Sequence, residues 1–186
     1  MFDNRAVHGE PIKCEVKWRR EHINSFKGRA IVIIRNPYKA IISNWNHMKA
    51  TSNTKIADAS TFKTLAFEKF VFQQSLRWLE VIEDWITFGR EVHFIFYENF
   101  VDNPIEETRK LVKYLKLPID EDRLSCLSKA TTGSFLRTGH QPKIPFTLDQ
   151  HRIIRMMIRQ ADKIVKDHNN EGLPIEKYKE FKLNLC

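Results

Sequence analysis

Apolar residues along the chain form two short continuous runs, separated by segments with a helical repeat. The first run consists of four successive β-branched side chains, Ile31 to Ile34, a pattern typical of a strand buried on both faces, and it predicts a strand at residues 30–35. The second run, residues 92–97, is rich in aromatic and β-branched residues and predicts another buried strand. Strands that alternate with helices indicate an α/β fold, with a mostly parallel sheet flanked by helices.

The helical segments are predicted by apolar residues that recur every three to four positions, with capping residues at their ends. They cover residues 37–47, 62–88, 104–116, 120–129 and 148–168. In the longest of them, five residues are expected to face the core: Phe67, Val71, Trp78, Ile82 and Trp85.

The remaining segments show little apolar periodicity. Small and polar residues predict loops at 51–60 and 130–146, and residues 1–28 contain one possible short strand, at 14–18. The sequence has no internal repeat and no convincing domain boundary. Residues 1–186 are therefore predicted to form one domain, long enough to bury a full core.

The junction after the first strand carries the strongest indication of chemistry. Asn36 can cap a helix and Pro37 suits its first turn, so Arg35 is expected at the carboxyl edge of the sheet, where open α/β sheets bind ligands. Ser43 lies in the helix that follows. A guanidinium, a hydroxyl and free backbone N–H groups at a helix start together predict a phosphate site. Alternatively, Arg-Asn-Pro is an ordinary strand-to-helix turn.

This junction has the pattern Arg-Asn-Pro, five residues, then Ser, directly after a hydrophobic strand. The pattern resembles the 3′-phosphate-binding segment of sulfotransferases, enzymes that use 3′-phosphoadenosine 5′-phosphosulfate (PAPS) as co-substrate. The resemblance implies a P-loop-like sulfotransferase fold, in which Arg35 and Ser43 hold the 3′-phosphate of the nucleotide.

A second match surrounds the end of the second strand. The sequence Phe-Ile-Phe-Tyr-Glu-Asn-Phe at 94–100, followed by a helix that ends in Leu-Lys-Leu-Pro, resembles the second half of the same fold. The resemblance implies that Tyr97 flanks the adenine. The alternative is that Tyr97 covers the core at the strand end. Glu98 is expected to make a structural hydrogen bond rather than to take part in catalysis.

A third match lies at residues 134–139, Ser-Phe-Leu-Arg-Thr-Gly. It resembles the Phe-x-Arg-Lys-Gly loop of cytosolic sulfotransferases, which implies that Arg137 and the backbone N–H of Gly139 also hold the 3′-phosphate. Glycine permits the close approach of a backbone to a phosphate, and arginine can bind one bidentately. Thr138 departs from the expected lysine, which removes one positive charge.

Within the superfamily, the chain is most similar to the sulfotransferases that accompany WSC domains. This likeness rests on Ile-Arg-Asn-Pro-Tyr at 34–38, Gly-Ser-Phe-x-Arg-x-Gly at 133–139, and Asp-His-Asn-x-x-Gly-Leu-Pro at 167–174. It implies a parent protein of the Golgi membrane or lumen that acts on sialic acid or on another glycan or glycoprotein. The sequence itself contains no WSC module, no anchor and no run long enough to span a membrane.

Several parts of a complete sulfotransferase are not recognisable. The residues before Arg35 contain no Gly-Thr-rich loop for the 5′-phosphosulfate, so the first strand and its phosphosulfate loop are expected to be missing. The catalytic histidine of the family, in a Lys-Thr-His segment, has no clear counterpart near Lys17; His22, which is close in sequence, is a candidate for the base, whereas His8 is expected to be a surface or packing residue. We expect an N-terminally truncated or a degenerate, catalytically silent form.

Composition adds a preference for anionic partners. The net charge is +8. The segment 137–159 is especially basic, with Arg137, His140, Lys143, His151, Arg152, Arg155 and Arg159 against a single acid, Asp149. No nucleic-acid-reading motif is present, so no nucleic-acid partner is predicted. A non-catalytic nucleotide or polyanion binder remains the alternative to an enzyme.

The cysteines indicate no metal site. Cys14, Cys126 and Cys186 are far apart and match no ligand spacing, so no metal is predicted. Isolated thiols are favoured, and one disulfide is the alternative.

Overall fold

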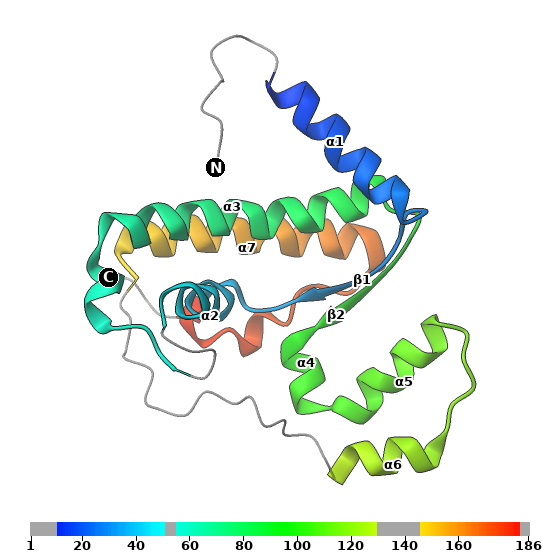
Figure 1. Cartoon of the computed structure of the whole chain (residues 1–186). Helices are drawn as coiled ribbons and strands as arrows, with labels where there is room; N and C mark the ends of the chain where they lie inside the picture. Colours follow the sequence, from blue (N-terminus) through cyan, green and yellow to red (C-terminus); the bar gives the residue numbers. More distant parts are fainter. Residues whose placement is uncertain (1–10, 51–54, 130–145, 183–186) are drawn as a thin grey trace.

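The computed structural model describes residues 11–50, 55–129 and 146–182, and their centre is a small parallel sheet (Figure 1). Strands β1 (Arg29–Ile34) and β2 (Glu91–Phe96) pair in register from Arg29 opposite Glu91 to Ile34 opposite Phe96. The connection between them contains helices α2 (Pro37–Lys49) and α3 (Leu65–Phe88), joined by the 3₁₀ helix η1 (Ala59–Lys63). A parallel pair needs such a crossover, because its two strands run in the same direction.

The other elements cover the sheet on two sides. Before the sheet comes α1, and after it come α4, α5, α6, α7 and two 3₁₀ helices. Their bounds are α1 (Pro11–Ser25), α4 (Tyr97–Asp102), α5 (Pro104–Tyr114), α6 (Glu121–Lys129), α7 (Leu148–Asn169), η2 (Ile175–Lys177) and η3 (Lys179–Lys182). Helices α3 and α7 lie side by side along one face of the sheet, while α5 and α6 lie on the other side (Figure 1).

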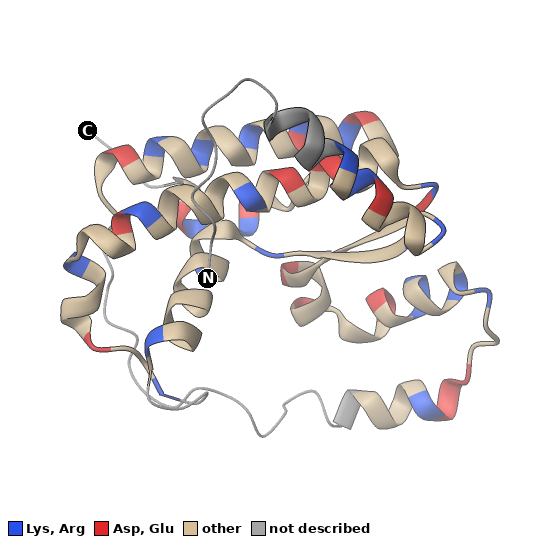
Figure 2. Cartoon of the chain, turned by 45° about the horizontal axis from the view of Figure 1, so that its top comes forward, with Lys and Arg blue, Asp and Glu red and all other residues tan. Residues whose placement is uncertain are grey.

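The hydrophobic core lies between the sheet and the α3–α7 layer. Val32 and Ile34 of β1 pack into one cluster with aromatic and aliphatic side chains of α3 and α7. The predicted inner face of α3 is confirmed: Phe67, Val71 and Ile82 are buried, and the two tryptophans pack partly buried against the cluster. Figure 2 shows Lys and Arg interleaved with Asp and Glu along these long helices.

Residues 14–18 are helical, so the short strand predicted there was wrong. They belong to α1, whose C-terminal half packs on the end of α3: Arg19 Nη1 lies 3.1 Å from Asp84 Oδ2, and the Arg20 guanidinium lies over the Phe88 ring. The inward-facing Ile23 is buried. The contacts of α1 therefore repeat with the spacing of a helix. Some of the contacting residues are polar, so the sequence shows no apolar repeat that would have predicted this helix.

The prediction that β1 is buried on both faces was also wrong. Val32 and Ile34 are buried, but Ile31 is 41% exposed and Ile33 is 65% exposed. In the part of the chain that the structure describes, β1 pairs with β2 alone. On the outer face, Tyr114 of α5 reaches only the start of the sheet, where its hydroxyl donates a hydrogen bond to the Glu91 carbonyl at 2.9 Å. Ile33 lies beyond that cover.

The exposed apolar side of β1 is expected to promote self-association, because an unpaired strand edge beside apolar side chains is a template for further pairing. Replacing Ile33 with Lys should shift the chain towards the monomer at a given concentration, since a charged edge residue opposes such pairing. Sedimentation velocity over a concentration series measures this. Val81→Lys changes a half-exposed residue on α3 and should have no effect. Equal association of wild type and Ile33→Lys would contradict the prediction.

Among the described residues, no helix is long and apolar enough to cross a membrane.

Candidate nucleotide-binding site

The register of the sheet brings two predicted site residues together. Arg35 and Tyr97 directly follow Ile34 and Phe96, which are paired residues, so both leave the sheet at its carboxyl edge. The Arg35 guanidinium carbon lies 4.6 Å from the centre of the Tyr97 ring. This cation–π contact orients the guanidinium while leaving the edges of its plane available for hydrogen bonds.

The backbone on both sides of Arg35 is held by hydrogen bonds from distant elements. Trp78 Nε1 on α3 donates to the Arg35 carbonyl at 3.0 Å. The Asn36 N–H donates to Glu98 Oε1 at 3.1 Å, and both Asn36 and Glu98 are buried. Glu98 thus makes the structural hydrogen bond expected from the sequence. The turn that carries Arg35 is thus fixed to α3 through Trp78 and to α4 through Glu98.

Asn36 is also the cap of α2. Its Oδ1 accepts a hydrogen bond from the Tyr38 N–H at 3.0 Å, and its Nδ2 donates to Glu180 Oε2 at 2.9 Å. The prediction of an asparagine cap followed by Pro37 in the first turn is confirmed.

The sequence predicted that free backbone N–H groups at the start of α2 would hold a phosphate. At the first positions of this helix, the prediction was wrong. The Asn36 N–H is taken by Glu98, Pro37 has no N–H, and the Tyr38 N–H is taken by the Asn36 side chain. Two carboxylates, those of Glu98 and Glu180, already lie at this positive end of the helix dipole. At these positions, an anion must therefore be bound by side chains.

Arg35 supplies such a side chain. Its Nε atom is buried and has no hydrogen-bond partner among the described residues. A buried donor without a partner costs free energy, so it is an observation that a bound anion would explain.

Of the other predicted nucleotide-binding residues, the structure describes Ser43 alone. Ser43 lies on α2, seven residues after Asn36, and is therefore almost two turns further along the same side of the helix. It is half-buried. Arg137 and Gly139 lie outside the described residues, so their convergence with Arg35 stays a prediction.

The structure does not bring His22 close to Arg35 and Tyr97. His22 is exposed on α1, stacked at 5.4 Å on Trp18 and meeting the edge of Phe26 at 5.2 Å. The chain then turns into the amino end of β1, whereas Arg35 follows its carboxyl end (Figure 1). His22 and Arg35 therefore lie at opposite ends of the strand.

A groove of about 320 Å³ adjoins Tyr97, and three lysines line it. Its residues are Lys39, Tyr97, Glu98, Val101, Asp102, Lys177 and Lys179. Lys177 Nζ lies 2.6 Å from Asp102 Oδ2, while Lys39 and Lys179 are exposed. Sequence reasoning missed Lys177 and Lys179 as site residues, because they come from a segment far from the motifs that indicate the site. Together with Arg35, the lysines favour a negatively charged ligand.

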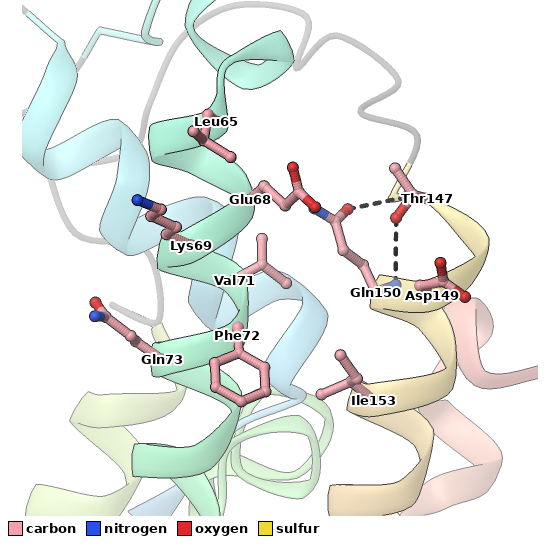
Figure 3. Close-up of a pocket in the computed structure, with 10 residues that line it drawn as sticks. All are labelled: Leu65, Glu68, Lys69, Val71, Phe72, Gln73, Thr147, Asp149, Gln150 and Ile153. Carbon is pink, nitrogen blue, oxygen red and sulfur yellow. Dashed lines mark hydrogen bonds between the residues drawn. The ribbon is translucent and has the colours of Figure 1, made fainter.

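A larger pocket, of about 450 Å³, lies between the first turns of α3 and α7 (Figure 3). Apolar residues such as Val71, Phe72 and Ile153 line it, and the capping box of Thr147 and Gln150 closes one side. None of the predicted nucleotide residues in the described part of the chain lines this pocket. We therefore place the candidate site at the Arg35–Tyr97 edge, although that groove is smaller.

Beneath the start of α2, Tyr38 and His151 form a buried polar contact, with His151 Nδ1 3.2 Å from the Tyr38 hydroxyl. Burial raises the pKa of Tyr38 to about 12, against the opposing effect of Arg155. Burial and the nearby Arg155 lower the pKa of His151, while Glu180 opposes this shift. Both groups are therefore held neutral near pH 7.

The lowered pKa of His151 predicts that the protein loses stability on acidification. Below the ordinary value of 6.5, the unfolded chain binds the proton more readily than the folded one, so the free energy of unfolding falls as pH drops towards the folded pKa. The pKa of His93 is also lowered by burial, so His151→Gln should reduce the slope only in part. Urea unfolding between about pH 5 and 8 measures it. An unaltered slope in His151→Gln would contradict the prediction.

Comparison with known proteins identifies the family. The model of the sulfotransferase domain family matches residues 15–166, and the chain belongs to that family. Both the resemblance seen in the sequence and the α/β fold are thereby confirmed.

The curated relatives narrow the relationship. A WSCD family member of Aedes aegypti is 25% identical over 114 residues, which are 59% of this chain and 36% of that protein. WSCD family members of Drosophila pseudoobscura pseudoobscura and Drosophila melanogaster are each 26% identical over 113 residues, 59% of this chain and 35% of theirs. The chain is thus related to the WSCD family and spans about a third of the length of these relatives.

Proposed function

We propose that this domain binds PAPS through its 3′-phosphate and serves the transfer of a sulfuryl group to a carbohydrate hydroxyl. The observation that carries the proposal is the Arg35 guanidinium, which is stacked on Tyr97 at the carboxyl edge of the sheet and has a buried Nε without a partner among the described residues. PAPS, when bound, supplies the activated sulfuryl group.

Each residue has a distinct role in this proposal. Arg35 binds the 3′-phosphate with two parallel N–H donors, a geometry that suits phosphate. Ser43 adds a hydroxyl donor, and Arg137 with the Gly139 N–H completes the site by resemblance to the family. Tyr97 also lines the groove, and its aromatic ring offers an adenine a surface on which to stack.

The acceptor and location are proposed from the resemblance to WSC-domain sulfotransferases. We propose a glycan or glycoprotein acceptor, with sialic acid as the first to test, and action at the Golgi membrane or lumen. The lysines beside Tyr97 support an anionic ligand of either kind, nucleotide or acidic sugar.

The placement of His22 supports the expectation that this chain is catalytically silent, and a nucleotide-binding homologue without activity is the alternative. No other base is assigned, and affinity for the 3′-phosphate acts equally on bound substrate and transition state, so it does not by itself lower the chemical barrier. We therefore expect the chain of residues 1–186 to bind PAPS without transferring its sulfuryl group.

Two assays test the proposal. In the first, radiolabelled PAPS should bind the chain and be displaced by 3′,5′-adenosine bisphosphate more readily than by 5′-AMP; equal displacement by the two would contradict the site. In the second, labelled sulfate transfer to sialylated glycans should stay at the level of a no-enzyme blank. Turnover above the blank that Arg35→Ala abolishes would show that the chain is an active enzyme.

A further inference from the structure

The C-terminal segment contributes directly to the turn that carries Arg35, although it lies beyond the region matched by the family, which ends at residue 166. Asn36 Nδ2 donates a hydrogen bond to Glu180 Oε2 at 2.9 Å, between residues 144 positions apart. We propose that Glu180 is a positioning residue for the nucleotide site. This inference rests on the proposed function.

The segment around Glu180 is held firmly against the fold. Tyr178 is fully buried, and Arg155 of α7 donates from Nη2 to the Phe181 carbonyl at 2.6 Å. On the other side, Lys177 Nζ lies 2.6 Å from Asp102 Oδ2 at the end of α4. Since residues on both sides of Glu180 are anchored, its carboxylate is presented to Asn36 at a fixed position.

Through Asn36, this carboxylate acts on Arg35. The Asn36 side chain is bonded at both ends, with Nδ2 on Glu180 and Oδ1 on the Tyr38 N–H, so its orientation is fixed. Arg35 is the preceding residue. Without the carboxylate, Nδ2 of a fully buried asparagine would lack its acceptor, and the cap could rotate to find another. The guanidinium would then be less firmly held in the orientation that binds phosphate.

Charge and geometry make opposite predictions at this position. As a negative charge near an anion site, Glu180 should weaken phosphate binding, so its removal should strengthen binding. As a positioning residue it should strengthen binding, so loss of its acceptor oxygen should weaken it. Glu180→Gln separates the two effects, because the amide oxygen still accepts a hydrogen bond and the charge is gone.

Calorimetry of the full chain with 3′,5′-adenosine bisphosphate and with 5′-AMP gives the preference for the 3′-phosphate as a ratio of affinities. We expect Glu180→Ala to reduce this ratio by about five- to tenfold, the effect of one lost hydrogen bond, and Glu180→Gln to retain it. Glu176→Ala removes an exposed carboxylate from the same segment and should leave the ratio unchanged. If the alanine variant does not fold, Glu180→Ser, whose hydroxyl is too short to reach Asn36, takes its place.

An unchanged ratio in Glu180→Ala, or tighter binding of the bisphosphate by both the Ala and Gln variants, would overturn the inference while leaving the proposed function intact. A wild-type chain that binds the two nucleotides equally would overturn the proposed function, and the inference with it.

Discussion

Replacing Arg35 with Ala should remove most of the preference for 3′,5′-adenosine bisphosphate over 5′-AMP. Arg35 is the only predicted phosphate ligand whose side chain the described part of the structure places against a second predicted site residue, at 4.6 Å from the Tyr97 ring. A charge-assisted bidentate pair contributes about 1.5–3 kcal/mol, which corresponds to a loss of about 10- to 150-fold in relative affinity. Calorimetry with both nucleotides measures it.

Two further variants separate geometry from charge. Arg35→Lys keeps the positive charge but loses the planar pair of donors, so it should fall between wild type and Arg35→Ala. Arg123→Ala removes the same charge from an exposed position on α6 and should leave the preference intact. If Arg35→Ala and Arg123→Ala had equal and small effects, nucleotide binding would depend on overall charge, and the assigned site would be wrong.

Replacing Glu98 with Ala should destabilise the fold more than any other single carboxylate change at the site. Glu98 is only 8% exposed, and its Oε1 accepts the Asn36 N–H. A hydrogen bond to a charged group contributes about 1.5–3 kcal/mol, and its loss leaves a buried N–H without a partner, so the free energy of unfolding should fall by about that amount. Urea denaturation measures the change.

Glu98→Gln keeps an acceptor oxygen and should retain most of the stability. The second carboxylate oxygen of Glu98 is buried without a partner among the described residues, so neutralising the side chain removes an unfavourable buried charge. Glu106→Ala, at an exposed carboxylate on α5, should change the free energy of unfolding by less than about 0.5 kcal/mol. A Glu98→Ala variant as stable as Glu106→Ala would contradict the structural role of the Glu98 hydrogen bond.

Local pattern was sufficient to predict most of the fold. The apolar runs predicted β1 and β2, and the helical repeats with their caps predicted α2, α3, α5, α6 and α7 within a few residues. The pattern was insufficient where burial depends on partners: a run of isoleucines shows that a strand is apolar, but not whether a further strand or helix covers Ile33. In α1, the charged residues Arg19 and Arg20 pack on the fold as well as the buried Ile23, so no apolar period stood out.

Within the described part of the candidate site, the sequence predicted the residues that directly follow the two parallel strands. Parallel strands place their carboxyl ends at one edge, which is why motifs at Arg35 and Tyr97, far apart in the sequence, meet in space. Glu180 and the lysines of the C-terminal segment could not be found this way, because no periodic pattern links them to β1. His22 shows the converse, since a residue near Arg35 in sequence lies at the other end of the strand.

The most direct test of the Arg35–Tyr97 site is a crystal structure of the full chain with 3′,5′-adenosine bisphosphate. We expect the 3′-phosphate within hydrogen-bond distance of the Arg35 guanidinium, with Ser43, Arg137 and the Gly139 N–H around the same phosphate and the adenine beside Tyr97. A nucleotide bound elsewhere, or Arg137 on the opposite side of the sheet from Arg35, would contradict the assignment.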